Sequence, residues 1–407
     1  MLALISVIIA GNYYAYDSIA PVADLLRTER GLSQTQIGLL NAVFSLPNIF
    51  LALAGGILID RYGPARVALW TAALCCVGTI LAAIESPFGL MVLGRLLFGV
   101  GEETLYIALL AGLAQWFSGG GTALAMSLFF SLARVGSYAA DISPRWAHAL
   151  YEHGSQPPLW LAAAITGVSL VAAITYAYLD SKARRATRAV AQAHERVAWS
   201  DIRKFDRSYW YILALNVLFA SVFFPFRSTF AIEYFQDAKG LTLQAAGLVN
   251  SWVFFAAIFA TPLFGLVADR LGHRALMMTV GTLMLPLTFL VLGATNWSLW
   301  ISTALMGLSF SVVPAVIWPS TAMLVGPSRL GTAYGLVNVL QNVGLAVCNM
   351  AAGWLNDAAG AGPENPAGFD GMLWFFGALG FVAFAFVALL WRRELGPFGR
   401  GLESART

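Results

Sequence analysis

The stretch GILIDRYGPAR at residues 56–66 recurs as GLVADRLGHR at residues 265–274. Each copy follows a long apolar run and precedes another, as a charged hairpin between two membrane spans does. A hairpin that returns after about half of the chain indicates two copies of one membrane unit. The residue types that the copies share are Gly56, Asp60, Arg61, Gly63 and Arg66 in the first and Gly265, Asp269, Arg270, Gly272 and Arg274 in the second.

The composition of the 407-residue chain is that of a membrane protein. Hydrophobic residues make up 59% of it and charged residues 11%, whereas soluble domains carry about 25% charged residues. Apolar runs of about 20 residues, each long enough to cross a bilayer, recur along the whole chain. Because lipid cannot satisfy backbone hydrogen-bonding groups, such spans are helices, and we predict an all-α membrane protein. The net charge of +3 gives no sign of nucleic-acid binding.

We predict twelve transmembrane helices, six on either side of a basic linker. The expected organisation is an N-terminal six-helix bundle at 1–180, a cytoplasmic linker at 181–207, and a C-terminal bundle with a short tail at 208–407. The expected spans are 2–26, 36–58, 66–84, 90–117, 122–143, 158–180, 208–236, 243–267, 275–294, 297–324, 330–355 and 370–391.

Lysine and arginine are distributed unevenly among the predicted loops. Of the 24, the loops after spans 2, 4, 6, 8 and 10 and the C-terminal tail hold 17, the opposite loops hold 4, and 3 lie within spans. Positive charge stays on the cytoplasmic side of a membrane. We therefore expect both termini, the linker and both hairpins to be cytoplasmic.

The repeat extends beyond the hairpins, because spans 1, 2 and 5 match spans 7, 8 and 11 in order. The aligned stretches are 13–18 with 223–228, 38–41 with 247–250, and 132–136 with 340–344. Two copies in the same orientation are related by an axis along the membrane normal. The substrate path of such a protein would lie between the two copies.

On these features the chain resembles the major facilitator superfamily. The doubled hairpin, the twelve spans, the basic linker and the pattern of Arg95, Gly99 and Gly101 in span 4 carry the resemblance. It implies the major facilitator fold, in which two six-helix bundles are related by a parallel pseudo-two-fold repeat. It also implies transport of a small molecule, with spans 1, 4 and 7 lining the central cavity.

Asp60 and Asp269 are the hairpin residues to which we assign a gating function. A carboxylate there can pair with a helix N-terminus or a basic residue across the gate, weakly in water and more strongly where closure excludes water. That difference favours one of two states, as a carrier needs. The alternative is that the hairpin serves only topology and turn geometry, with Gly63 and Gly272 at positive φ.

Ionisable side chains at membrane depth usually face a cavity or a partner. Glu103 in span 4 and Arg134 in span 5 offer one carboxylate and one guanidinium near midspan, which together can bind the two charges of a zwitterion. The alternative is that the two pair only with each other and hold spans 4 and 5 together. The other candidate substrate-binding residues are Asp17, Tyr13, Tyr14, Tyr16, Arg227, Asn250, Trp252, Trp318, Asn338 and Asn342.

The remaining charges of these spans are assigned to structure. Glu102 lies seven residues after Arg95, on the same helix face, and we interpret the two as a structural pair with Arg95 as an anchor. Asp141 is expected to be a satisfied carboxylate near the outer surface. Aromatic residues such as Phe223 and Phe226 can either line a cavity or pack as ordinary core.

Three segments resemble the lysosomal dipeptide uniporter branch of the superfamily. They are YYAYD at 13–17, GRLLFGVGEET at 94–104 and LARVGS at 132–137. The resemblance implies that Glu103 and Arg134 bind the two termini of a dipeptide. We therefore predict a carrier of dipeptides or other small zwitterions that works by alternating access, as a uniporter or coupled to protons.

Two other functions stay open. An organic-anion transporter or antiporter would use Arg134 and Arg227 together, and a receptor or scaffold that no longer transports would need neither charge. The sequence holds no enzyme motif, so we expect no enzymatic activity, cofactor or metal. The expected partners are the small substrate and the lipid bilayer. We expect the protein to be a monomer that can bind an accessory subunit. The preference for arginine over lysine favours a bacterial protein, which we expect in the inner membrane. In a eukaryote we expect the lysosomal membrane.

Overall fold

The computed structural model describes residues 1–85, 87–117, 122–186, 205–325 and 329–404. Within these residues the regular elements are helices. The chain divides into two compact units, Met1–His194 and Glu195–Thr407, and each is described by itself. Most of the predicted linker, including Arg188, Arg196 and Arg203, lies outside the described residues.

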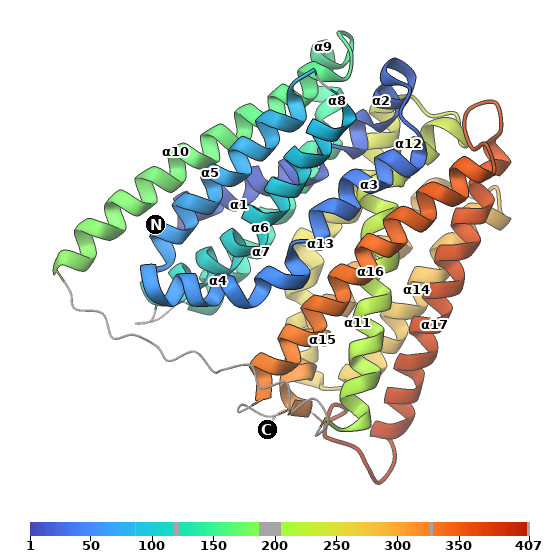
Figure 1. Cartoon of the computed structure of the whole chain (residues 1–407). Coiled ribbons are helices and arrows are strands. Elements are labelled where there is room, and N and C mark those ends of the chain that lie inside the picture. The colour runs from blue at the N-terminus through green and yellow to red at the C-terminus, as the bar shows by residue number, and fades with distance from the viewer. Residues whose placement is uncertain (86, 118–121, 187–204, 326–328, 405–407) are drawn as a thin grey trace. The chain divides into compact units, whose positions relative to one another are not determined.

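The first unit contains the helices of the first six predicted spans (Figure 1). Span 1 corresponds to α1 (Leu2–Asp17), the 3₁₀ turn η1 (Ala20–Val22) and α2 (Ala23–Arg30), and span 2 to α3 (Gln34–Ser45) and α4 (Asn48–Tyr62). Spans 3 to 6 are α5 (Pro64–Ala83), α6 (Phe88–Trp116), α7 (Thr122–Asp141) and α10 (Gln156–Ala186), with the short helices α8 (Ser143–Trp146) and α9 (His148–Tyr151) before α10.

The second unit contains the helices of the last six spans. Span 7 is α11 (Arg207–Pro225), the π-helical turn η3 (Phe226–Phe230) and α12 (Ala231–Asp237). The others are α13 (Leu243–Leu271), α14 (Arg274–Ala294), α15 (Leu299–Val325), α16 (Leu330–Ala358) and α17 (Asp370–Glu394), which follows the short η5 (Pro366–Phe369).

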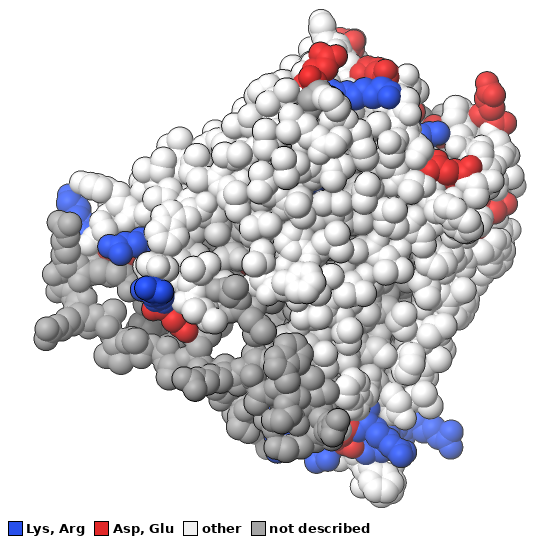
Figure 2. All heavy atoms as spheres, in the orientation of Figure 1, with Lys and Arg blue, Asp and Glu red and all other residues white. Residues whose placement is uncertain are grey.

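Each of the twelve predicted spans thus has a helical counterpart. Ten helices of the described residues are long and apolar enough to cross a membrane, and the pair α3 and α4 makes an eleventh if it is one span. The 20-residue α7 occupies the place of the remaining span. In the view of Figure 2, charged side chains lie at the ends of the helices and the surface between them is uncharged.

Helix packing repeats from one unit to the other. In the first unit α1 packs against α7 and α10, and α5 packs against α6 and α10. In the second unit α11 packs against α16 and α17, and α14 packs against α15 and α17. In both units, therefore, the first span packs against the fifth and sixth, and the third span packs against the fourth and sixth. The repeat predicted from the hairpins is thus present in the helix packing as well.

Prolines interrupt three of the predicted spans. Pro21 lies in the turn between α1 and α2, Pro47 precedes α4, and Pro225 ends α11 before the π-helical turn. Proline has no amide hydrogen and its ring collides with the preceding turn, so the helix stops or changes its geometry there. The spans expected at 2–26 and 208–236 therefore continue through a 3₁₀ turn and a π-helical turn, whereas the span expected at 36–58 is sharply bent between Leu51 and Gly55. α10 also continues to Ala186, into the first residues of the predicted linker.

Candidate functional site

The close packing of α1 on α7 brings Tyr13 and Arg134 together. A Cβ on Gly136 would lie 2.0 Å from the backbone oxygen of Ala10, so only glycine permits this approach of the two helices. Two residues before Gly136, the Arg134 guanidinium carbon lies 4.9 Å from the centre of the Tyr13 ring. That distance is within the range of a cation–π contact. Tyr13 and Arg134, two of the candidate substrate-binding residues, therefore lie in contact.

α6 contributes the two adjacent glutamates to the same region. A Cβ on Gly99 would lie 2.2 Å from the backbone oxygen of Phe44, so α6 packs against α3 one turn before the acidic pair. Glu102 is buried and Glu103 is half-buried, as expected for neighbours that point about 100° apart on a helix. Glu103 is thus the more accessible of the two.

Electrostatic contacts join these side chains into one group. Tyr13 interacts with Arg134, Glu102 and Glu103, and Tyr106, one turn after Glu103, interacts with Tyr13, Glu103 and Arg134. We call these five residues from α1, α6 and α7 the first-half cluster. It contains a guanidinium with several donors, carboxylates of opposite charge and two phenol rings, all within one unit.

The chemistry of the first-half cluster suits a small molecule that carries both charges. Arg134 can donate two parallel hydrogen bonds to a carboxylate, and a glutamate carboxylate can accept from an ammonium group. The phenol rings can add polar contacts and a flat apolar surface. Two carboxylates beside one guanidinium disfavour a ligand with negative charge only.

The predicted pairing of Arg95 with Glu102 is wrong. Arg95 donates instead to the backbone oxygens of Ala15 (3.2 Å), Tyr16 (3.3 Å) and Leu40 (3.3 Å), and to the side chain of Asn41. Seven residues of helix separate the two α-carbons by about 10.5 Å. The carbonyls at the broken end of α1 need donors, because lipid supplies none. Arg95 is a structural anchor, as predicted, but it binds backbone oxygens of α1 and α3 in place of the Glu102 carboxylate.

The other span 1 candidates have contacts of their own. Tyr14 is buried and its ring lies 6.3 Å from that of Trp146. Tyr16 packs against Phe44, with ring centres 4.7 Å apart, and interacts electrostatically with Glu102 and Tyr13. Asp17 is 1% exposed at the last position of α1 and interacts electrostatically with both Tyr13 and Tyr16. Of the three candidate phenols, Tyr13 contacts the Arg134 guanidinium with its ring.

In the second unit Arg227 and Asn250 lie together inside the bundle. Arg227 is fully buried on the π-helical turn, with its guanidinium carbon 3.7 Å from the centre of the Phe254 ring. The Asn250 amide donates to the backbone oxygen of Arg227 at 3.2 Å. Phe223 and Phe226 are buried in the surrounding aromatic core, where Phe223 stacks on Phe310 at 4.2 Å. These two phenylalanines therefore pack as ordinary core.

The remaining candidates of the second unit have other surroundings. The Asn342 amide donates to both oxygens of Asn338, one turn earlier on α16. Trp318 packs against Tyr334 at 5.4 Å. Trp252 is 43% exposed on the face of α13 that also exposes Phe259, Leu263 and Leu266. Such a stripe of exposed apolar side chains is typical of a lipid-facing surface.

The two hairpins share their backbone turn but differ in their arginines. The amides of Gly63 and Gly272 donate to the oxygens of Ile59 and Ala268, and both glycines have positive φ, at 85° and 70°. Asp60, Arg61 and Arg66 are exposed, and so are Asp269 and Arg270.

Arg274 is the exception, because it is 1% exposed and donates to Asp269 at 2.9 Å. This basic partner of Asp269 comes from its own hairpin, at the first position of α14, and differs from the partner across the gate that we predicted.

A family model for the Major Facilitator Superfamily matches residues 2–240 and 212–405. The chain belongs to this superfamily. A crystal structure of the nucleoside transporter NupG superposes with a TM-score of 0.77 at 14% identity, over 95% of this chain and 99% of that one. The likeness shows the major facilitator fold.

Curated relatives within the superfamily are transporters by name. The chain is 31% identical over 363 residues to the lysosomal dipeptide transporter MFSD1 of Homo sapiens, covering 86% of this chain and 78% of the relative. It is 24% identical over 394 residues to the probable sulfoacetate transporter SauU of Cupriavidus necator, covering 89% and 88%. The prediction of a multi-pass membrane transporter of this superfamily, related to the dipeptide branch, is confirmed.

Two members of the first-half cluster were not predicted as site residues. Glu102 was assigned to a structural pair, and Tyr106 was not singled out. Tyr106 follows Glu103 by three residues, a spacing that places two side chains on one helix face and could have indicated it.

Proposed function

We propose that this superfamily member transports dipeptides by alternating access, with Glu103 and Arg134 binding the two ends of the peptide. The observation that carries the proposal is the first-half cluster, in which a guanidinium, carboxylates and Tyr13 share one region at membrane depth. The peptide carboxylate would bind Arg134, and the peptide ammonium would bind Glu103. The sequence likeness to MFSD1 supports the same substrate class.

The remaining candidates take secondary functions in this proposal. Tyr13 holds the Arg134 guanidinium through the contact with its ring. Asp60 and Asp269 regulate closure on the side that the charge distribution predicts to be cytoplasmic. The protein works as a monomer, and Glu103 or Asp17 carries a proton if transport is coupled.

Purified protein in detergent tests the substrate class directly. Ligands that bind the native state raise the melting temperature, so we expect stabilisation by dipeptides such as Ala-Ala, and less by free alanine or by succinate. Glu103→Gln and Arg134→Ala should each remove the shift. Glu364→Ala, at an exposed glutamate outside the spans, is the matched control and should keep it.

Proteoliposomes then separate transport from binding. Vesicles loaded with radiolabelled dipeptide should release it faster when they contain the wild type than when they contain Glu103→Gln or Arg134→Ala. An excess of unlabelled dipeptide should saturate this release. The proposal would be rejected if dicarboxylates or sulfonates, and not peptides, stabilised the protein and were transported. That result would favour the organic-anion alternative, which the likeness to SauU keeps open.

A further inference from the structure

The segment after α17 folds back onto the second hairpin. The amide of Arg274 donates to the oxygen of Leu402 at 2.9 Å, and the amide of His273 donates to the oxygen of Glu403 at 3.3 Å. The Glu403 carboxylate accepts from the amide of Leu276 at 2.9 Å and lies 3.0 Å from His273 Nδ1. Four contacts therefore join two residues of the tail to the first turn of α14.

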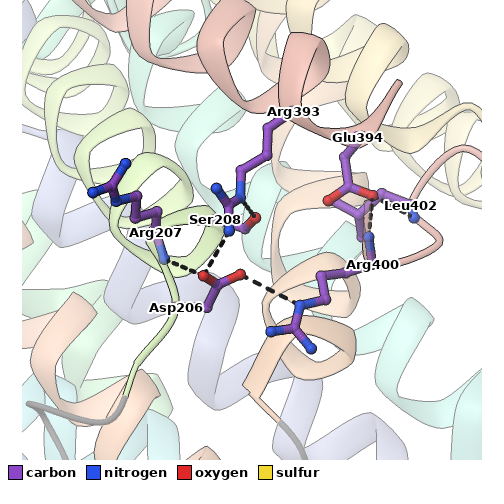
Figure 3. A network of polar contacts seen from close by, with 7 residues as sticks. All are labelled: Asp206, Arg207, Ser208, Arg393, Glu394, Arg400 and Leu402. Atoms are coloured by element: carbon purple, nitrogen blue, oxygen red, sulfur yellow. Dashed lines mark hydrogen bonds and ion pairs between the residues drawn. The ribbon is translucent and has the colours of Figure 1, made fainter. Parts of the chain in front are cut away.

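The same tail is fixed to the ends of α11 and α17. The Glu394 carboxylate accepts from the amides of Arg400 (2.8 Å) and Leu402 (3.2 Å), which closes the turn between them (Figure 3). Asp206, which caps α11, accepts from Arg393 at 2.8 Å and from Arg400 Nε at 3.3 Å. Leu402 is fully buried beneath these polar contacts.

Asp206 is held in its ionised form by this arrangement. Partial burial alone would raise its pKa, but the Arg207 amide and the guanidinium groups of Arg393 and Arg400 outweigh that effect and lower the pKa below its usual range. Arg393 also donates to Ser208 at 3.0 Å. The start of α11, the end of α17 and the tail thus form one connected network.

The hairpin contains a residue whose backbone requires such support. His273 has φ 49°, and it is the one non-glycine residue with positive φ among those that the structure describes. The left-handed conformation is unfavourable for a residue that has a Cβ, and it persists where surrounding contacts enforce it. At the equivalent position of the first hairpin stands Pro64, which has no amide hydrogen and begins α5 directly.

We propose that residues 395–404 form a clasp that sets the geometry of the second hairpin, with Glu403 as its positioning residue. By holding the backbone of His273 and Arg274, the clasp keeps Arg274 where it pairs with Asp269. The His273–Glu403 side-chain contact is solvent-exposed on the histidine side and adds little by itself. The bonds to the three backbone amides of the hairpin carry the effect. The expected consequence for transport rests on the proposed function.

Hydrogen–deuterium exchange of the purified full-length protein tests the clasp without any substrate. Glu403→Ala should raise the exchange rate of residues 272–276 about tenfold, the factor expected from losing one to two net hydrogen bonds. The matched control Glu364→Ala should leave that rate unchanged. Unchanged exchange at 272–276 in Glu403→Ala would overturn the proposal.

A second variant separates positioning from general destabilisation. Glycine adopts positive φ without cost, so in a His273→Gly background the hairpin should need the tail less, and adding Glu403→Ala should raise exchange by less than about threefold. An equal increase in both backgrounds would mean that Glu403 does not act through this turn, and the proposal would fail.

Transport assays complete the test and distinguish the two proposals. With a transported dipeptide, Glu403→Ala should lower the maximal rate at least about threefold and leave KM within about twofold, because Glu403 touches the hairpin and not the first-half cluster. A changed KM with an unchanged maximal rate would contradict the clasp. If the wild type moves no dipeptide, the proposed function fails while the exchange experiment still decides the clasp.

Discussion

Replacing Gly136 by alanine should force α1 and α7 apart at the candidate site. The new Cβ would lie 2.0 Å from the Ala10 oxygen and 2.8 Å from its carbonyl carbon, whereas ordinary contact begins at 3.4 Å. Both obstacles are backbone atoms, so a helix must move by roughly 1.4 Å, the difference between 3.4 and 2.0 Å. Such a shift would take the Arg134–Tyr13 contact from 4.9 Å to about the 6 Å limit of cation–π attraction.

The energetic effect follows from two opposing contributions. Overpacking costs about 1–3 kcal/mol, and alanine in place of glycine within a helix gains about 1 kcal/mol. Gly167→Ala on α10 is the matched control, because a Cβ there meets nothing within 4 Å and the variant gains the helix contribution alone. Gly136→Ala should therefore be less stable than Gly167→Ala by about 1–3 kcal/mol.

Thermal unfolding in detergent and dipeptide binding measure the two consequences. A difference of 1 kcal/mol corresponds to about 2–4 °C for a domain of this size, and loss of the Arg134 geometry should weaken dipeptide binding about tenfold or more. The reasoning would be refuted if Gly136→Ala melted and bound dipeptide as Gly167→Ala does.

Three further predictions concern other parts of the chain. Arg134→Lys keeps the charge but loses the two-pronged donor, so dipeptide binding should weaken by about 1.5–3 kcal/mol in competition assays; unaltered binding would mean that Arg134 makes no paired hydrogen bonds. Arg95→Leu leaves backbone carbonyls without donors. It should lower the free energy of unfolding by about 3 kcal/mol or more in melting experiments and have little effect on KM. A selective rise in KM would place Arg95 at the substrate. Because the pKa of Asp206 is lowered on folding, its contribution to stability is complete above about pH 3.9 and is lost as pH falls from there through the folded value. Asp206→Asn should therefore flatten the dependence of melting temperature on pH below about pH 4, and an unchanged slope there would assign acid sensitivity elsewhere.

Much of the fold could be predicted from the sequence, because bilayer thickness limits the length of each span and the hairpin marks the repeat. The irregular turns within spans 1 and 7 and the bend within span 2 were missed although prolines gave part of the signal. Pro47 and Pro225 can be read directly as positions where a helix cannot continue unchanged. The π-helical turn after Pro225 has no comparable signal, because an added residue within a turn depends on what the surrounding helices accept.

The site was predictable where chemistry alone identified the residues. Arg134 and Glu103 were singled out as charges at membrane depth, and Tyr13 and Arg134 do lie together. The predicted Arg95–Glu102 pair failed because helix spacing shows which side chains share a face, and not which distant backbone groups need a donor. The contacts of Glu403 with the hairpin were equally invisible, since they join residues about 130 positions apart in the chain.

The contrast between Pro64 and His273 bears on how duplicated halves diverge. After an internal duplication, each copy of a turn can change only as far as its surroundings tolerate. Proline fixes the backbone of the first hairpin at this position. The second copy holds a residue there that its own turn disfavours, and in our proposal it depends on ten residues at the far end of the sequence. Two hairpins that look alike in an alignment are therefore unequal at this position, and changes to the tail would reach the second hairpin through its bonds to Leu402 and Glu403.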